Sequence, residues 1–218
     1  MLMPVFLSRD TNYFPDVALA DKDGLLAVGG NLSLNTLLNA YRHGIFPWYN
    51  ENEPICWYCP DPRFVLFPSC IKVSHSMKKI IKDKVFTFSI DTNFSGVIKN
   101  CRMAERKRVP GTWITDEIEE AYTALFEKGF AHSAEAWHNK ELVGGIYGVQ
   151  LGKVFFGESM FANKSNASKF ALIKFVEALQ KNGVQLIDCQ VYTPHLESLG
   201  AEFTPRKEFT GMLNKLIV

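Results

Sequence analysis

Two acidic side chains and one amide lie inside two apolar runs of the sequence. Asp188 and Gln190 interrupt the run 186–192, and Glu158 interrupts the run 154–161. Asp188 and Gln190 are two residues apart on an expected strand, so their side chains should leave it on the same face. A carboxylate in apolar surroundings is unfavourable unless it is paired, hydrogen-bonded or used in chemistry. We interpret the three as a reaction site; a structural carboxylate is the alternative for each acid.

Other arrangements of reactive residues are not supported. The segment around Ser159 is not a Gly-x-Ser-x-Gly elbow, and no Ser-His-acid triad is apparent. Cys56 and Cys59 form a Cys-x-x-Cys pair, but Pro60-Asp61-Pro62 follows, where a redox pair would need a helix. A zinc site would need a second ligand pair, which the sequence lacks. We expect this cysteine pair to be incidental.

Composition narrows the class of protein. The chain has 218 residues, 47% of them hydrophobic, and a formal net charge of +1, so it can build a substantial core. No apolar run approaches the roughly 20 residues of a membrane helix, and the N-terminus lacks the basic start of a signal peptide. Five cysteines without a disulfide spacing favour a reducing, cytoplasmic location.

The elements that must position the acidic residues follow from periodicity and turn signals. A helix is expected after the cap at 31–33, and the stiff segment 60–63 separates a small N-terminal domain, 1–62, from a larger domain, 63–218. In the larger domain the pattern predicts an α+β fold with a mixed, largely antiparallel sheet. Strands are expected at 65–68, 131–138, 141–150, 154–161 and 186–192, and helices at 74–84, 94–106, 116–128, 170–181, 195–199 and 209–216.

Three further patterns have two open interpretations each. The basic stretches 72–84 and 99–108 suit an RNA backbone or a solvated helix face. Trp48 and Trp113 follow turn signals and can stack on bases, although a core position is commoner for Trp. The glycines in the strand 144–148 indicate either a ligand chain lying against the strand or a bend in the sheet.

Taken in order, seven motifs resemble the bacterial leucyl/phenylalanyl-tRNA–protein transferases. The resemblance is collinear from about residue 6 to about residue 209. The motifs are 24–30 (GLLAVGG), 44–48 (GIFPW), 60–63 (PDPR), 111–115 (GTWIT), 157–161 (GESMF), 166–169 (NASK) and 188–190 (DCQ).

The resemblance implies a small N-terminal domain and a catalytic domain with an acetyltransferase-like (GNAT) core. It also implies an aminoacyltransferase, which moves leucine or phenylalanine from leucyl- or phenylalanyl-tRNA to the α-amino group of proteins beginning with Arg or Lys. The product is marked for N-end-rule degradation. No metal or cofactor is expected because the tRNA ester is already activated. We expect a cytoplasmic monomer with no membrane partner.

The resemblance also implies residue roles. Asp188 orients or polarises the attacking amine, directly or through Gln190, and Glu158 lies near the aminoacyl site; whether Asp188 takes the proton is open. Trp48 and Trp113 hold the terminal adenosine, and Lys78, Lys79 and Lys82 contact the tRNA backbone. The apolar aminoacyl pocket comprises Ile146, Phe155, Met160, Leu172, Phe175, Leu179 and Ile187.

Two departures from the family pattern bear on these roles. Ile146 and Leu179 stand where familiar members have Met and Phe, so the shape of the pocket should differ. His75 and Asp83 stand where some relatives have Arg.

The competing hypotheses are a GNAT-type acyl-CoA transferase and a non-catalytic RNA-binding module. The first needs a Gly-rich pyrophosphate turn before the helix near 170, which is lacking, and the second leaves the buried acids unexplained.

Overall fold

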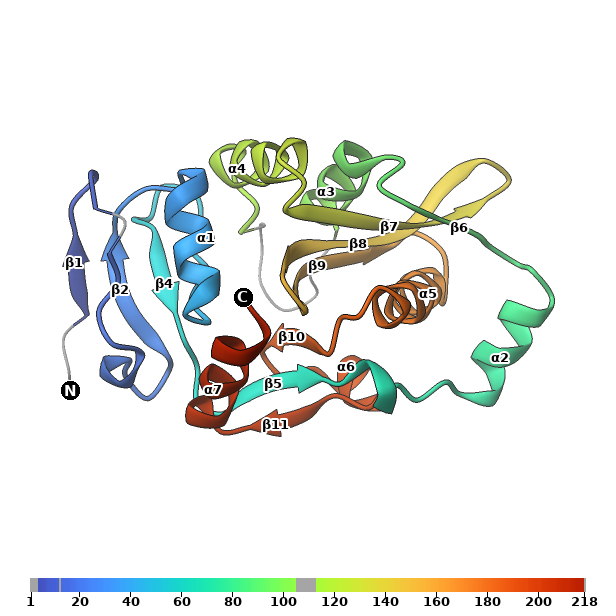
Figure 1. Cartoon of the computed structure of the whole chain (residues 1–218). Coiled ribbons are helices and arrows are strands. Elements are labelled where there is room, and N and C mark those ends of the chain that lie inside the picture. The colour runs from blue at the N-terminus through green and yellow to red at the C-terminus, as the bar shows by residue number, and fades with distance from the viewer. Residues whose placement is uncertain (1–3, 12, 105–112, 218) are drawn as a thin grey trace.

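The computed structural model describes residues 4–11, 13–104 and 113–217. Its strands form two sheets, one drawn from the first sixty residues and one from the remainder (Figure 1). The first sheet has the order β1-β2-β4-β3. Its strands are β1 (Val5–Leu7), β2 (Leu25–Gly29), β3 (Phe46–Pro47) and β4 (Cys56–Tyr58).

The second sheet has the order β11-β5-β10-β9-β8-β7-β6. Only the β10–β9 pair is parallel; the other neighbours in this sheet are antiparallel. The expected mixed, largely antiparallel sheet is therefore confirmed. The strands are β5 (Arg63–Leu66), β6 (Thr87–Ile90), β7 (Ala131–His138), β8 (Glu141–Leu151), β9 (Val154–Ala162), β10 (Leu186–Gln190) and β11 (Glu202–Thr204).

The helices agree closely with the periodicity. Five begin at a side chain that accepts a hydrogen bond from the first turn, namely Ser33, Ser74, Asn93, Thr115 and Thr193. The helices are α1 (Leu34–Arg42), α2 (His75–Lys82), α3 (Phe94–Met103), α4 (Asp116–Glu127), α5 (Ala167–Lys181), α6 (Pro194–Ser198) and α7 (Arg206–Leu216), with 3-10 turns at Val17–Leu19 and Pro68–Cys70. Part of the helix expected at 94–106 lies outside the described residues.

The large sheet separates two hydrophobic clusters. Helices α3 and α4 cover one face and α5 the other (Figure 1). The cluster on the α3/α4 face also contains Leu37, Tyr41 and Trp57, so it runs without a break into the N-terminal sheet. The division of the chain into domains 1–62 and 63–218 stays a prediction.

The glycine-rich strand β8 is explained by packing. A Cβ at Gly144 would lie 2.6 Å from the Cβ of Ala167 in α5, and one at Gly148 would lie 2.1 Å from the carbonyl oxygen of Phe156. The register also shifts at Tyr147/Gly148. Protein atoms occupy the space that a ligand chain would need, which favours the bend in the sheet over the ligand interpretation.

Candidate active site

The site lies where β9 and β10 separate. They pair only from Leu186–Val154 to Asp188–Phe156. Past this point Glu158 is the extra residue in a bulge of β9 against β8, and a register shift falls between Asp188 and Gln190. A cavity of about 780 Å³ opens there. The bulges thus end the pairing and aim polar side chains from both strands at one opening.

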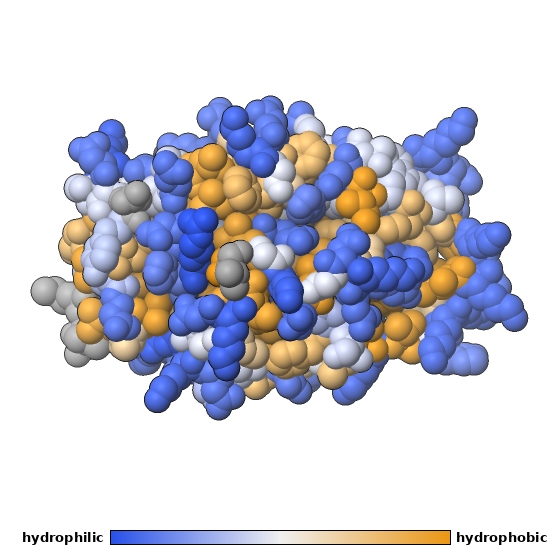
Figure 2. All heavy atoms as spheres, in the orientation of Figure 1, coloured by the Kyte–Doolittle hydropathy of each residue, from blue (hydrophilic) through white to orange (hydrophobic). Residues whose placement is uncertain are grey.

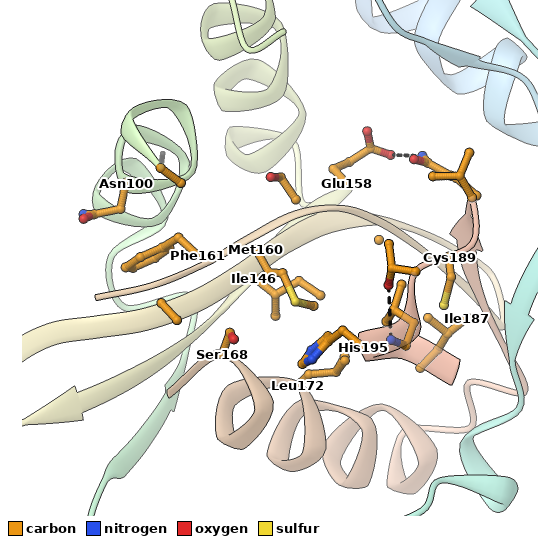
Figure 3. Close-up of a pocket in the computed structure, with 18 of the residues that line it drawn as sticks. Asn100, Ile146, Glu158, Met160, Phe161, Ser168, Leu172, Ile187, Cys189 and His195 are labelled. Carbon is orange, nitrogen blue, oxygen red and sulfur yellow. Dashed lines mark hydrogen bonds between the residues drawn. The ribbon is translucent and has the colours of Figure 1, made fainter. Parts of the chain in front are cut away.

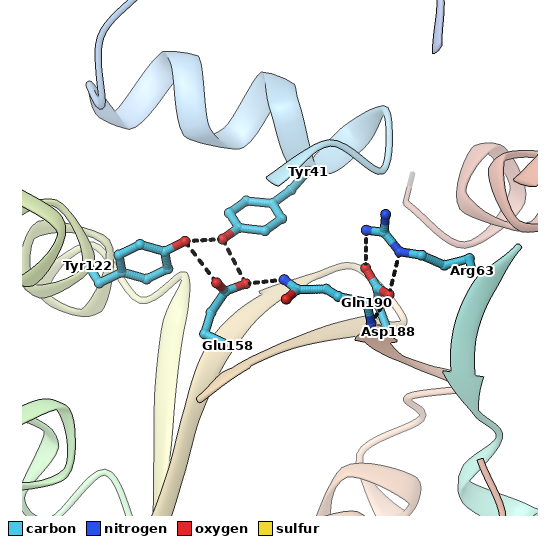
Figure 4. A network of polar contacts seen from close by, with 6 residues as sticks. All are labelled: Tyr41, Arg63, Tyr122, Glu158, Asp188 and Gln190. Carbon is cyan, nitrogen blue, oxygen red and sulfur yellow. Dashed lines mark hydrogen bonds and ion pairs between the residues drawn. The ribbon is translucent and has the colours of Figure 1, made fainter. Parts of the chain in front are cut away.

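Glu158 and Gln190 bridge this opening. The Gln190 side-chain amide, Nε2, donates to Glu158 Oε1 over 2.9 Å, as Figure 4 shows. Tyr41 from α1 donates to Oε1 (2.8 Å) and Tyr122 from α4 to Oε2 (3.0 Å). The carboxyl group of Glu158, on β9, is therefore hydrogen-bonded to side chains from β10, α1 and α4.

A count of protons defines the charge of this cluster. The two tyrosine hydroxyls also contact each other, so three oxygen–oxygen contacts link Tyr41, Tyr122 and Glu158. Two hydroxyl protons fill only two of these contacts, and a proton on Glu158 completes a closed ring. Burial accordingly raises the pKa of Glu158 to about 7, against the lowering effect of the tyrosine hydrogen bonds. Burial, then the nearby carboxylate, raises the pKa of both tyrosines, which remain donors.

Asp188 is paired with a cation that the motif analysis did not place in the site. Its Oδ1 accepts from Arg63 Nε (2.8 Å) and its Oδ2 from Arg63 Nη2 (2.7 Å), and both residues are fully buried. The Arg63 guanidinium also lies over the rings of Phe46 and Phe209. The sequence analysis used Arg63 only in the domain boundary and in the family motif 60–63, and gave it no role in the site. The sequence did contain a signal for this role, because Arg63 is a charged residue at the start of the apolar strand 63–66.

The third hydrogen-bond donor to Asp188 is the backbone N–H of Gln190. The Gln190 N–H donates to Asp188 Oδ1 over 2.9 Å, and Gln190 has a left-handed φ of 62°. Such a φ is unfavourable for a residue with a side chain and persists where its surroundings impose it. Both oxygens of Asp188 accept hydrogen bonds from the protein, and the residue is fully buried. Its position fixes the backbone turn that presents the Gln190 amide to Glu158.

Four of the apolar residues expected around an aminoacyl group lie below Glu158 in Figure 3. Ile146, Met160, Leu172 and Ile187 line the cavity. Phe155, Phe175 and Leu179 are buried in the same hydrophobic cluster without lining the cavity, and the first two pack edge to face with centroids 4.9 Å apart. The seven residues are thus assembled in two layers, four at the wall and three behind it.

The two tryptophans and the three lysines are not among the described residues that line the cavity. Trp48 follows β3, is 47% exposed and packs against Tyr58; Trp113 is partly buried against the α3/α4-face cluster. Neither lines the cavity. Helix α2 carries the exposed Lys78, Lys79 and Lys82 at the far end of the molecule from the N-terminal sheet, and hydrophilic side chains gather there (Figures 1 and 2). Lys79 forms an ion pair with Asp83, 2.6 Å away.

Within the described residues, no three His, Cys, Asp or Glu side chains gather as metal ligands would, and both Cys56 and Cys59 are free thiols. In the same part of the chain, no helix is long and apolar enough to cross a membrane.

Comparison with known proteins places the chain in a family. A model of the leucyl/phenylalanyl-tRNA protein transferase family matches residues 65–214, and a model of its N-terminal domain matches residues 30–61. A leucyl/phenylalanyl-tRNA–protein transferase of Syntrophus aciditrophicus is 54% identical over 98% of this chain and 89% of its own length. Another, from Flavobacterium johnsoniae, is 50% identical over 95% of this chain and 98% of its own length.

Similarity to solved structures is more distant. A GCN5-related N-acetyltransferase from Kribbella flavida matches 78% of this chain and 59% of its own, with 9% identity and a TM-score of 0.40. The two family models together match residues 30–61 and 65–214, and the relatives, which are about 50% identical, cover nearly the whole chain. The chain belongs to the leucyl/phenylalanyl-tRNA–protein transferase family.

Proposed function

We propose that this protein transfers leucine or phenylalanine from aminoacyl-tRNA to the α-amino group of proteins that begin with Arg or Lys, marking them for N-end-rule degradation. The observation that carries the proposal is the Gln190–Glu158 bridge, which spans the opening of an apolar cavity between β9 and β10. A cavity of this kind suits an apolar aminoacyl side chain, and the bridge places an amide and an acid beside its reacting carbonyl.

In this reaction the free amine attacks the ester carbonyl, a C–N bond forms, and the C–O bond to the tRNA ribose breaks. The amine loses a proton and the leaving ribose oxygen gains one. Among the described residues, Gln190 Oε1 has no hydrogen-bond partner, so it can accept a hydrogen bond from the amine. Glu158, with a pKa of about 7, is suited to take the proton near neutral pH. The ribose hydroxyl is the other acceptor.

Asp188 acts in this scheme as a positioning residue. Its carboxylate holds Arg63 and the backbone N–H of Gln190, so it fixes where the Gln190 amide points. The side chain of the transferred residue contacts Ile146, Met160, Leu172 and Ile187. An apolar pocket separates side chains that differ by one methylene by only about 1–3 kcal/mol, so Leu and Phe can share it.

The tRNA is bound outside the cavity. We propose that Trp48 and Trp113 stack on the terminal adenosine and that Lys78, Lys79 and Lys82 contact the phosphates, in a monomeric cytoplasmic enzyme with domains 1–62 and 63–218. Support comes from the exposure of Trp48 and the three lysines. Trp113→Ala should raise the KM for charged tRNA about 10- to 100-fold, since base stacking contributes roughly 1–3 kcal/mol. An unchanged KM would contradict the stacking role.

One assay tests the reaction itself. The protein is incubated with phenylalanyl-tRNA and a peptide that begins with Arg, and the N-terminal residue of the product is identified by mass spectrometry. We expect N-terminal Phe, with little transfer by Asp188→Ala. Acetyl transfer from acetyl-CoA without aminoacyl transfer would overturn the proposal in favour of a GNAT-type N-acyltransferase.

A further inference from the structure

Two aromatic rings are stacked on the protein surface next to the site. Tyr192 is 43% exposed and Phe203, on the edge strand β11, is 55% exposed. Their centroids are 5.7 Å apart and their planes differ by 20°. The buried ring of Phe64 supports both, with centroids 4.9 Å from Phe203 and 5.3 Å from Tyr192. The pair therefore forms a fixed aromatic platform that solvent reaches; we call Tyr192 and Phe203 the aromatic platform.

An exposed carboxylate lies at the edge of the aromatic platform. Glu197 of α6 accepts a hydrogen bond from the Tyr192 hydroxyl, with 2.8 Å between Oη and Oε2. A cation over an aromatic face is attracted by the ring, and a neighbouring carboxylate adds to this attraction. The same carboxylate repels a phosphate group. The charge of this surface therefore favours a cationic side chain over a nucleotide.

The aromatic platform adjoins residues that line the cavity along the chain. Val191, which lies between Gln190 and Tyr192, is 41% exposed and lines the cavity, as does Leu196 from the same helix as Glu197. A group seated on the rings is thus next to the chain segment that carries the Gln190 amide.

We propose that Tyr192, Phe203 and Glu197 form the subsite for the basic side chain of the acceptor's first residue. The inference rests on the proposed function, because it assigns the acceptor's place in that reaction. A planar guanidinium stacks on aromatic faces and pairs with carboxylates better than an ammonium does. The subsite should therefore favour Arg over Lys as the first residue.

The test compares Phe203→Ala and Glu197→Gln with the wild type in the transfer assay, with the KM of the Arg peptide and the KM of phenylalanyl-tRNA measured separately. Glu197→Gln keeps an oxygen for the Tyr192 hydroxyl and removes the charge. Phe6→Ala is the matched control, since Phe6 is 79% exposed on β1 of the other sheet. Peptides that begin with Arg or with citrulline, its neutral isostere, separate charge from shape.

Each variant should raise the KM of the Arg peptide about two- to fivefold, in line with an exposed cation–π contact of about 0.5–1 kcal/mol. The KM of the tRNA and all values for Phe6→Ala should stay unchanged, and the preference for Arg over citrulline should shrink. Unchanged acceptor values in both variants, or a rise in the tRNA KM instead, would overturn the subsite.

A wild type that shows no transfer would contradict the proposed function and leave the subsite to an equilibrium measurement. Fluorescence anisotropy of the labelled Arg peptide then decides: weaker binding to Phe203→Ala and Glu197→Gln than to Phe6→Ala supports the subsite. Equal binding by all proteins, or none, contradicts it.

Discussion

At the scale of single residues, the chemistry depends on how Glu158 is held. Three oxygen–oxygen contacts link Glu158, Tyr41 and Tyr122, and a third proton is needed to fill them all. Burial also favours the protonated acid, because it raises the pKa of Glu158 to about 7. Glu158 therefore changes its charge near neutral pH, where a general base has to accept a proton. The ring makes its ionisation depend on two helices, α1 and α4, that carry no other part of the bridge.

This arrangement predicts the pH dependence of the rate. If Glu158 takes the proton, kcat/KM should rise with pH through about 7, in addition to the rise caused by the acceptor's own α-amino group. The pH profile of Glu158→Gln should lose the rise near pH 7 and keep the rise caused by the acceptor's α-amino group. Tyr41→Phe should move the first rise to higher pH, because the tyrosine hydrogen bond lowers the pKa of Glu158. Identical profiles for wild type and Glu158→Gln would assign the proton to the ribose hydroxyl.

The same pKa links stability to pH. Because the folded-state pKa of Glu158 is raised above its model value of 4.5, the folded protein binds the extra proton between that value and about 7. The stabilisation that this proton gives to the folded state is present at low pH and is lost as the pH rises through about 7. The Tm of the wild type should therefore fall relative to that of Glu158→Gln between about pH 4.5 and pH 7 in calorimetry. A constant difference in Tm would contradict the raised pKa.

The ion pair beneath the bridge predicts a large loss of stability. Asp188→Asn leaves Arg63 as a buried cation with no charged partner, which typically lowers the free energy of unfolding by about 3–5 kcal/mol. Urea denaturation measures this loss. Asp83→Asn is the matched control, since its ion pair with Lys79 is exposed and should contribute nothing measurable. A similar effect of both substitutions would contradict the structural role assigned to Asp188.

At the scale of elements, the site exists because regular strands are interrupted. Glu158 is the extra residue of a bulge, and Gln190 ends β10 in a left-handed conformation. In a regular ladder β9 and β10 would stay paired and leave no opening between them. The small residues of β8 then let α5 approach the sheet, which brings Leu172 to the wall of the cavity.

Two glycines make this packing testable. Gly144→Ala would place a methyl group 2.6 Å from Ala167 Cβ and 2.9 Å from the Ser168 nitrogen, so α5 must shift. We expect a loss of about 1–3 kcal/mol in the free energy of unfolding. Gly211→Ala, within α7 and with no atom within 4 Å of the new Cβ, should instead stabilise by about 0.5–1 kcal/mol. Equal effects in urea denaturation would contradict the close approach of α5.

At the scale of the whole molecule, the N-terminal sheet contributes directly to the site. Tyr41 of α1 contacts Glu158, Phe46 of β3 lies against the Arg63 guanidinium, and one hydrophobic cluster includes residues of both sheets. The two parts of the chain should therefore unfold together. Hydrogen exchange under native conditions should give β2 and β8 the same free energy of global opening. Earlier opening of β2 would show that the N-terminal part unfolds independently.

The sequence alone determined most of the elements and the identity of the family. The helices were predictable because their caps and apolar periodicity are local, and so were the hairpin 131–150 and the strands carrying Glu158 and Asp188. The strands β1–β4, β6 and β11 were not predicted. They are two to five residues long, so their pairing partners define them more than their own pattern does.

Only the tertiary structure decided what the acidic residues do. The sequence put Asp188 and Gln190 on one face but did not reveal that Arg63, 125 positions away, occupies the carboxylate of Asp188, or that Tyr41 and Tyr122 close a ring on Glu158. Such partners are joined by the folding of distant segments and leave no local periodicity. The pKa of an acid depends on burial and on those partners, so the proposed roles of Glu158 and Asp188 rest on contacts that only the folded chain makes.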